Sequence, residues 1–246
     1  MTETKSGISG STVKLVGIIA MLIDHFAAAV LARVLLSGGW TDQLYDVYQI
    51  LRMVGRLGFP IFCFLLVEGF QKTGSRAKYA LRLGLFALIS EVPFDLAFSA
   101  KVLEFDYQNV YFTLFLGLLA LCAYDFIEKR KYSTFLQWLL CAVALGWFMI
   151  LAELLNTDYG GMGVLTITVI YILRRSNVLA MAGGCAVLTL MALNELPAFF
   201  AVFPVGAYNG KRGLKLKYFF YAFYPVHLFL LWMVTWFMGT ADIPVI

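Results

Sequence analysis

Two adjacent ionisable residues, Asp24 and His25, lie near the middle of an apolar stretch that runs from residue 13 to residue 36. Ionisable side chains are costly inside a bilayer, so those that are kept there are functional candidates by default. The chain has two histidines, and the second, His227, also lies inside an apolar stretch. Imidazole titrates near neutral pH, which suits it to act as a general base. The histidines therefore predict either proton transfer at membrane depth or a buried pair that locks two helices together by hydrogen bonds.

Asp24 and His25 are sequence neighbours, so on a helix their side chains point about 100° apart. We therefore expect them to face different partners rather than each other. In this hypothesis His25 faces a water-filled cavity as the general base. Asp24 then orients a second group, such as His227 or an incoming amine.

A second group of ionisable residues is expected near the outer end of the helices. Arg52 and Arg56 are four residues apart and share one helix face, as do Glu91 and Asp95 on another helix. The two arginines are expected to neutralise the two carboxylates, either as a structural stack of ion pairs or as a polar pocket that binds the substrate. The same pocket is expected to hold three further polar residues, Asn109, Asp158 and Glu195.

Basic residues gather in two places, at 72–82 and 209–217. They either serve topology alone or bind phosphate, with the turn at Asn209 and Gly210 presenting backbone amides to an anion. Pro225 predicts a kink that opens the last helix to a ligand. The candidate residues for a phosphate-bearing ligand are Lys78, Arg82, Asn209, Lys211, Arg212, Lys217 and Tyr224.

The elements that must position these residues are membrane helices. The chain has 246 residues, 61% hydrophobic and 14% charged, with a mean hydropathy of +0.82. A soluble domain carries roughly 25% charged residues, so the composition excludes an ordinary soluble protein. The four cysteines form no CxxC pair, and we expect no metal site and no nucleic-acid partner. No repeat or linker divides the chain, so we expect one integral membrane domain over residues 1–246.

Apolar windows predict an all-α, polytopic bundle of about nine transmembrane helices, with a range of roughly eight to ten. The loops between these helices alternate between a set rich in Lys and Arg and a set that is acidic or neutral. By the positive-inside rule this alternation places the N-terminus in the cytoplasm and the C-terminus outside. The expected spans are residues 14–36, 51–70, 78–99, 109–126, 134–153, 161–173, 178–194, 196–208 and 218–238.

Several long motifs occur together and in a distinctive order. They are IDH in the first span, RMVGRLGFPIFCFLLVEGF at 52–70, YALRLGLFALISEVPFDLAF at 79–98, NVYFTLFLGLL at 109–119, and NGKRG followed by KYFFYAFYPVHL near the end. In this combination the chain resembles the TraX family over nearly its whole length. That family is named for the membrane protein that N-acetylates F-pilin in conjugation systems.

The resemblance implies an integral-membrane acetyltransferase of the bacterial inner membrane, with acetyl-coenzyme A as the donor. It places Asp24, His25 and His227 at the centre of the site. The adenosine phosphates of the donor would lie on the cytoplasmic basic residues, and its pantetheine arm would reach toward the histidines. The resemblance also highlights Arg56, Arg82, Glu91 and Asn109.

The acceptor and the reaction order remain open at this point. The acceptor would be a pilin-like peptide, a cell-envelope sugar or a lipid, and it would enter from outside. Direct transfer and transfer through an acetylated histidine both fit the residues. The main rival class is a proton-coupled small-molecule transporter, which also uses intramembrane ionisable residues, although the chain shows no inverted repeat. A third class is a non-catalytic scaffold in envelope assembly, which would not require ionisable residues in the middle of a span.

Overall fold

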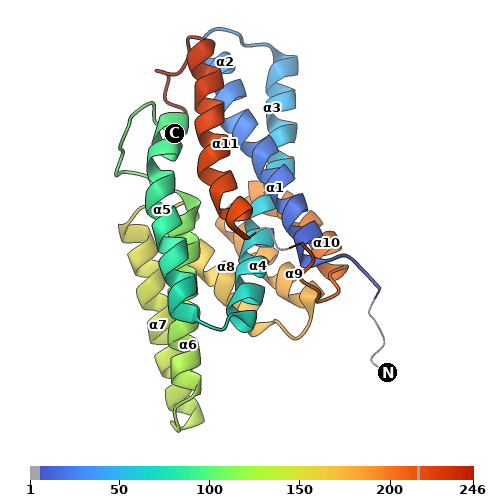
Figure 1. The fold of residues 1–246 in the computed structure, drawn as a ribbon, viewed down its shortest axis with the longest axis vertical. Coiled ribbons are helices and arrows are strands. Elements are labelled where there is room, and N and C mark those ends of the chain that lie inside the picture. The colour runs from blue at the N-terminus through green and yellow to red at the C-terminus, as the bar shows by residue number, and fades with distance from the viewer. Residues whose placement is uncertain (1–5, 215–216) are drawn as a thin grey trace.

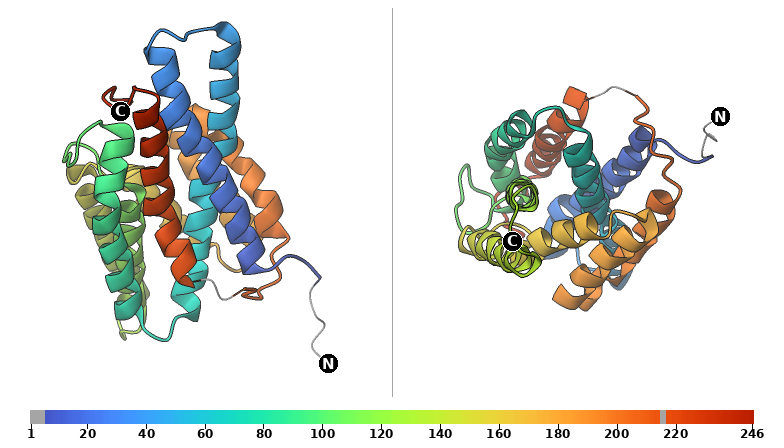
Figure 2. Two further views of the ribbon diagram at one scale, coloured as in Figure 1. Left: turned by 45° about the horizontal axis from the view of Figure 1, so that its top comes forward. Right: turned by 90° about the horizontal axis from the view of Figure 1, so that it is seen from below.

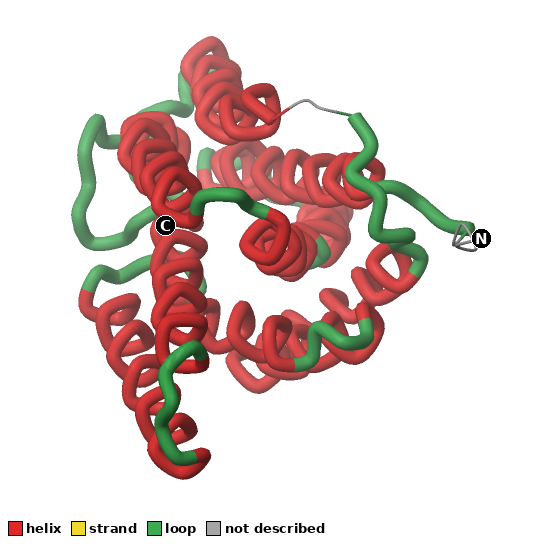
Figure 3. Tube along the Cα trace, turned by 60° about the horizontal axis from the view of Figure 1, so that its bottom comes forward, coloured by secondary structure: helices red, strands yellow, loops and turns green. Residues whose placement is uncertain are grey.

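The computed structural model describes residues 6–214 and 217–246, which are mostly helical. These residues contain no strand, only two isolated β-bridges, and Figure 3 shows helices joined by loops throughout. The all-α prediction is confirmed. The helices are α1 (Gly10–Phe26), the π-helical turn η1 (Ala27–Leu31), α2 (Ala32–Leu36), α3 (Asp42–Gly55), α4 (Gly58–Lys72), α5 (Arg76–Phe98), α6 (Val110–Glu128), α7 (Thr134–Leu154), α8 (Gly160–Ile172), α9 (Asn177–Met191), the 3₁₀ helix η2 (Leu193–Ala201), α10 (Val202–Gly206) and α11 (Lys217–Phe237).

The helices have the lengths and composition of membrane spans. Five stretches are long and apolar enough to cross a membrane: Gly10–Leu36, Asp42–Lys72, Val110–Glu128, Thr134–Leu154 and Tyr218–Phe237. The other four predicted spans correspond to α5, which carries charged residues toward both ends, and to three shorter apolar stretches, α8, α9 and η2 with α10. The chain is therefore an integral membrane protein, as the sequence predicts.

The second helical stretch begins at Asp42, well before the predicted residue 51. The first turns of α3 are polar, so a search for apolar windows does not include them. Thr41 starts this helix, because its Oγ1 accepts a hydrogen bond from the backbone N–H of Leu44 at 3.1 Å. Ser or Asn side chains cap other helices in the same way, at Ser9, Ser75, Asn109, Ser133 and Ser176.

The two predicted sets of loops lie at opposite ends of the bundle. At one end, Lys72 Nζ donates to the carbonyl oxygen of Gly210 at 3.0 Å. At the other end, the backbone N–H of Gln108 donates to the carbonyl oxygen of Asn156 at 2.9 Å. Figure 1 shows the loop at 37–41 at the top and the α6–α7 loop at the bottom. We call the lower end the basic end; it carries the loops at 73–75, 129–133, 173–176 and 207–214.

The two histidines lie on α1 and α11, and neighbouring helices position both. α1 packs against α3 and α4, and α11 packs against α5 and the π-helical turn η1. Figure 2 shows α11 running between α1 and α5, so the first and last helices of the chain are neighbours. On the other side of the bundle, α8 packs against α6, α7 and α9.

Glycines allow α6 and α8 to approach each other closely. A Cβ at Gly117 in α6 would overlap Ile167 Cδ1, and a Cβ at Gly163 in α8 would overlap Thr113 Cγ2. Ile167 and Thr113 are themselves fully buried, so neither side chain has space to move aside. Small residues at such crossings are the usual way for membrane helices to pack tightly.

Gly117→Ala should therefore destabilise the fold by about 1–3 kcal/mol, the usual cost of overpacking. Gly146→Ala in α7 is a matched control, because no atom lies within 4 Å of the added Cβ. The control should be neutral or stabilise by up to about 1 kcal/mol, since alanine favours helix over glycine. Unfolding in detergent measures both. Equal stabilities of the two variants would show that the α6–α8 crossing is not tightly packed.

Candidate functional site

The two histidines are in contact, although 202 residues separate them in the sequence. His25 Nδ1 lies 2.7 Å from His227 Nε2, and the rings are parallel with centroids 5.0 Å apart. His227 Nδ1 lies 2.8 Å from the carbonyl oxygen of Phe223. Because a carbonyl oxygen only accepts, His227 donates from Nδ1 and accepts at Nε2. In neutral rings His25 therefore donates from Nδ1 and keeps the lone pair of its Nε2 free, which is the state of a general base.

Each histidine lies close to an irregular part of its helix. The π-helical turn Ala27–Leu31 starts two residues after His25, and such turns are frequent at functional sites. Pro225 has no N–H, so the carbonyl of Tyr221 loses its partner within α11. That carbonyl accepts instead from the Tyr111 hydroxyl of α6 at 3.4 Å. The carbonyl that Pro225 frees thus has a partner on another helix.

Aromatic side chains enclose the histidine pair. Tyr224, only 3% exposed, contacts His25 and His227 edge-on, with ring centroids 5.8 and 5.6 Å away. Phe98 lies 5.6 Å from His25, and Phe223 stacks on His227 at 4.8 Å. These rings cover much of the pair, although His25 itself is only half-buried, and hydrogen bonds are stronger in low-dielectric surroundings.

Asp24 faces away from the histidines and forms an ion pair with Arg52. Its Oδ2 lies 2.7 Å from Arg52 Nη1, while its Oδ1 is buried without a hydrogen-bond partner. Gly55 permits this arrangement, because a Cβ at that position would overlap Asp24. Asp24 and His25 thus face different partners, as predicted. The suggested contact between Asp24 and His227 is wrong, because α1 turns Asp24 toward α3 instead of α11.

The second arginine of α3 is paired with η2. Arg56 Nη1 lies 2.7 Å from Glu195 Oε1, and the Glu195 side chain is only 2% exposed. The predicted pairing of Arg52 and Arg56 with Glu91 and Asp95 is therefore wrong. The physical reason is helix packing, since α3 lies against α1 and η2 whereas α5 lies against α6 and α11.

Glu91, Asp95 and Asn109 serve the local structure around α5. Glu91 and Asp95 belong to α5, and Asn109 caps the start of α6. Asn109 Nδ2 donates to the Ala87 carbonyl at 2.9 Å and to Glu91 Oε2. Asp95 Oδ2 accepts from the backbone N–H of Glu104 at 2.7 Å. These bonds fasten the 99–109 loop to α5 and fix the start of α6. None of the three residues lines either cavity described below.

A small inner cavity of about 60 Å³ adjoins His25. Asp158 accepts a hydrogen bond from the Tyr107 hydroxyl at 2.7 Å. Tyr159 has a φ of +63° and stacks on Phe59 with centroids 3.7 Å apart; a non-glycine residue in this backbone region stores strain, which clusters at functional sites. The cavity is lined by Met21, Asp24, His25, Gly55, Gly58, Phe59, Phe62, Val110, Leu114, Asp158 and Tyr159.

A larger cavity of about 500 Å³ opens at the basic end. Its volume lies in the range typical of small-molecule and cofactor sites. We call it the basic cavity, because four cations and one carboxylate line it. These charged residues are Lys14, Lys72, Arg82, Arg212 and Glu68.

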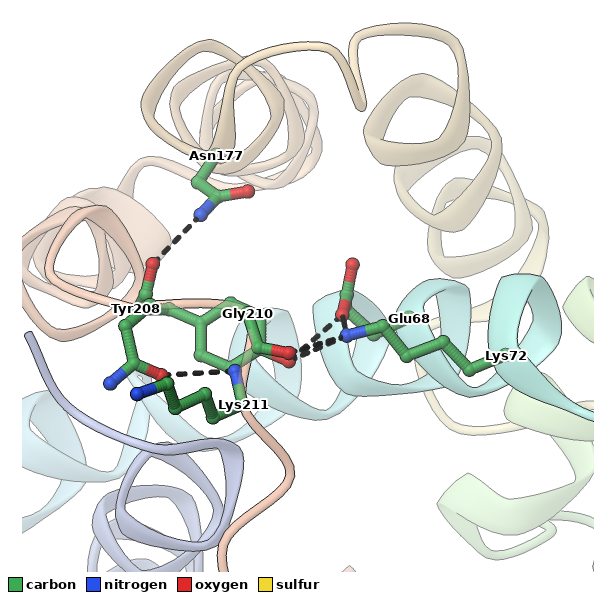
Figure 4. A network of polar contacts seen from close by, with 7 residues as sticks. Glu68, Lys72, Asn177, Tyr208, Gly210 and Lys211 are labelled. Atoms are coloured by element: carbon green, nitrogen blue, oxygen red, sulfur yellow. Dashed lines mark hydrogen bonds and ion pairs between the residues drawn. The ribbon is translucent and has the colours of Figure 1, made fainter. Parts of the chain in front are cut away.

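A network of polar contacts fastens the mouth of the basic cavity (Figure 4). Lys72 Nζ lies 2.6 Å from Glu68 Oε2 and donates to the Tyr208 hydroxyl at 2.9 Å. Tyr208 in turn donates to Glu68 at 2.9 Å. Asn177 Nδ2 donates to the Tyr208 carbonyl at 3.4 Å. The segment 207–214 is thereby held against α4 and α9, where it forms one wall of the cavity.

The predicted phosphate-binding residues divide between this cavity and its surroundings. Arg82 and Arg212 line it, and Arg82 Nε is buried without a hydrogen-bond partner. Lys78 and Lys211 are exposed and do not line it.

The other residues predicted for this ligand lie elsewhere. Asn209 Nδ2 donates to the Gly7 carbonyl at 2.9 Å, and its Oδ1 accepts from the backbone N–H of Lys211. The side chain of Asn209 thus binds backbone groups of neighbouring segments instead of presenting its amide to an anion. Tyr224 packs on the histidines, and the side chain of Lys217 lies outside the described residues.

Lys14 is a lining residue that the candidate set lacks. A signal for it was present, since Lys14 is a lone cation at the start of an apolar span. The sequence shows Lys72 only as one of several cations in the stretch 72–82. Its contact with Tyr208 depends on packing between distant segments. In the part of the chain that the structure describes, no three His, Cys, Asp or Glu side chains lie close enough together to hold a metal ion.

Comparison with known proteins assigns the family. The model of the TraX protein family matches residues 9–235. The chain belongs to the TraX family. A relative, "Probable fimbrial assembly protein FimC, serogroup H1" of Dichelobacter nodosus, is 34% identical over 250 residues, which cover 91% of this chain and 94% of the relative. No solved structure matches the chain. The family resemblance seen in the motifs is confirmed.

In this TraX-family protein, Arg56→Ala should strongly destabilise the fold. It would leave the buried Glu195 carboxylate without its partner, at a cost of about 3–5 kcal/mol. Adding Glu195→Gln should recover much of this loss. Lys101→Ala, which breaks an exposed ion pair with Glu104, is the control and should leave the stability nearly unchanged. Detergent unfolding of all four proteins checks this, and no recovery in the double variant would contradict it.

Asp158 should make stability depend on pH. Burial raises the pKa of this carboxyl to about 6, although the Tyr107 hydrogen bond and the charges of Arg52 and Arg56 lower it. Unfolded Asp titrates near pH 4, so the folded state binds the proton more tightly. The stability contribution of Asp158 therefore falls as the pH rises from about 4 to 6.

Asp158→Asn should remove this dependence. The free energy of unfolding of the wild type should rise by roughly 1–2 kcal/mol relative to that of the variant as the pH falls from 7 to 4. Melting temperatures at four pH values measure the difference. Asp106→Asn, which removes an exposed charge at the same end, controls for net charge. A difference between wild type and Asp158→Asn that does not change with pH would contradict the expectation.

Proposed function

We propose that this protein is an integral-membrane acetyltransferase that takes acetyl-coenzyme A at the basic cavity and transfers the acetyl group beside His25. The observation that carries the proposal is the adjacency of the two cavities. The basic cavity and the inner cavity share two lining residues, Phe62 and Leu114. A ligand bound among cations at the basic end would therefore have its far end at the cavity that His25 lines.

The basic cavity has the chemistry expected of a site for an anionic, nucleotide-bearing donor. Arginine guanidinium groups suit phosphate because they donate several N–H bonds in a fixed plane. Arg82 has a buried Nε that lacks a partner, so a phosphate oxygen would satisfy it. Tyr79 and Tyr221 also line the cavity and offer aromatic faces to a base.

His25 is the proposed general base. Its Nε2 takes a proton from the acceptor amine or hydroxyl while the acceptor nitrogen or oxygen bonds to the acetyl carbonyl carbon. The C–S bond of the thioester breaks, and His25 returns the proton to the departing thiolate. His227 supports this step by accepting from His25 Nδ1, which fixes the tautomer and orientation of the ring.

A two-step route conserves the same atoms. His25 Nε2 would bond to the acetyl carbon while the C–S bond breaks and coenzyme A departs as the thiolate. The acceptor nitrogen or oxygen would then bond to the acetyl carbon, the C–N bond to His25 would break, and the acceptor proton would pass to Nε2 and from there to the thiolate. Incubation of the protein with acetyl-coenzyme A in the absence of acceptor, followed by quenching, distinguishes the two routes. Detection of acetylated His25 would support the two-step route over direct transfer.

The proposed acceptor is an amine or hydroxyl of the cell envelope. The inner cavity adjoins Asp158 and Tyr159, which belong to the end opposite the basic end. The positive-inside rule places the basic end in the cytoplasm, so we propose the bacterial inner membrane as the location and entry of the acceptor from outside. Because one relative bears the name of a fimbrial assembly protein, a pilin-like peptide is the first acceptor to test, before sugars and lipids.

Acetyl-coenzyme A should raise the melting temperature of the detergent-purified protein. A ligand that binds only the native state stabilises it by about 2.7 kcal/mol at 100 times its Kd. Arg82→Ala should weaken binding at least about tenfold, because a charge-assisted hydrogen bond is lost. Lys78→Ala, one turn away on α5 but outside the cavity, is the control and should keep wild-type binding. His25→Ala should bind the donor without transferring the acetyl group.

Absence of any shift in protein shown to be folded would overturn the proposal. The paired charges Asp24–Arg52 and Arg56–Glu195 would then point to a proton-coupled carrier, and substrate flux in liposomes would test that class.

A further inference from the structure

The two cavities meet at a pair of apolar side chains. Phe62 of α4 and Leu114 of α6 line both the basic cavity and the inner cavity. On the basic side the space is about 500 Å³, and on the His25 side about 60 Å³. A group that travels from the donor site to His25 would pass beside these two side chains. Phe62 and Leu114 therefore form a gate between a large and a very small space.

Packing limits the freedom of the gate to move. Leu114 is only 6% exposed. Phe62 is half-buried, and its ring lies against the backbone of α1 at Gly17, where an added Cβ would come within 3.4 Å of Phe62 Cζ. Side chains in such contacts do not yield to a larger group without cost.

The walls of the inner cavity are equally fixed. Phe59 is 5% exposed and stacks on Tyr159. Asp24 is held by Arg52 on one side and by the close approach of Gly55 on the other. An extra methylene that points toward Phe59 or Asp24 would therefore meet a side chain that is held in place.

The inner volume matches a short acyl group. One water needs about 10–15 Å³ of such space, so about 60 Å³ holds roughly four to six groups of that size. The three heavy atoms of an acetyl group, the attacking atom of the acceptor and the carbon that carries it already number five, so little space is left for a longer acyl chain. Each further methylene has to displace the acceptor or push against the walls.

We propose that Phe62 and Leu114, with the small cavity behind them, restrict the acyl donor to two carbons. This inference rests on the acyltransferase function proposed above. An apolar pocket discriminates about 10- to 200-fold per methylene. We expect the affinity for coenzyme A thioesters to fall at least about tenfold from acetyl to propionyl and again from propionyl to butyryl.

Calorimetric titration of the detergent-purified full chain tests this with acetyl-, propionyl- and butyryl-coenzyme A. Phe62→Ala should bring the three dissociation constants to within about threefold of one another. Leu114→Val, a smaller change, should narrow the spread partly and covers the case in which Phe62→Ala fails to fold. Leu65→Ala is the matched control, because Leu65 lines the basic cavity but not the inner one; it should shift all three constants together and keep their ratios. Titration into protein-free micelles corrects for partitioning of the thioesters.

The possible outcomes separate the two proposals. If none of the three thioesters binds to folded wild type, the acetyltransferase function is wrong. If all three bind equally well to wild type, or the ratios stay unchanged in both gate variants, the donor site stands and the gate is wrong. A change of ratio in Leu65→Ala as large as in Phe62→Ala would also overturn the gate.

Discussion

The hydrogen bond between His25 and His227 joins the first and last helices of the chain, and the rest of the site depends on it. A polar group inside a membrane bundle must find its partner within the protein, because neither lipid nor bulk water supplies one. The Phe223 carbonyl fixes the proton of His227, and His227 fixes the proton of His25. One nitrogen at the end of this series is left free. The two hydrogen bonds that satisfy the packed histidines thus also determine which ring nitrogens carry a proton.

The same requirement explains which parts of the site the sequence could predict. Asp24, His25 and His227 stood out because charge within an apolar span is rare and costly. The partners did not, because sequence spacing reports only which residues share a helix face. Arg52 and Glu91 lie on suitable faces of suitable helices, yet α3 packs against α1 and η2 while α5 packs elsewhere. Pairings across 28 residues for Asp24 and Arg52, and across more than 100 for Arg56 and Glu195, are decided by tertiary packing.

For the basic cavity too, the composition of the loops predicts where positive charge lies, but not which side chains face the cavity. Clusters of Lys and Arg correctly indicated one end of the bundle, because Lys and Arg gather in the loops on one side of a membrane protein. Which cations face the cavity depends on depth and on neighbouring helices. Lys78 and Arg82 share a face of α5, but four residues separate them by about 6 Å along the helix axis. That distance places Arg82 beside Tyr79 and Tyr221 in the cavity and leaves Lys78 exposed. Lys14 faces the same cavity only because α1 packs against α4.

The narrow place at Phe62 and Leu114 has a consequence beyond chain length. A bundle with an open water-filled path from the basic end to Asp158 would conduct protons and small ions across the membrane. Two apolar side chains at the junction interrupt such a path, in the way that apolar constrictions close channels by excluding water. An acyl group is small and apolar enough to cross that barrier, whereas a nucleotide with its phosphates is not. In the proposed function, the separation of the two cavities would therefore allow transfer of the group without movement of the donor, with the same residues that keep the bilayer sealed.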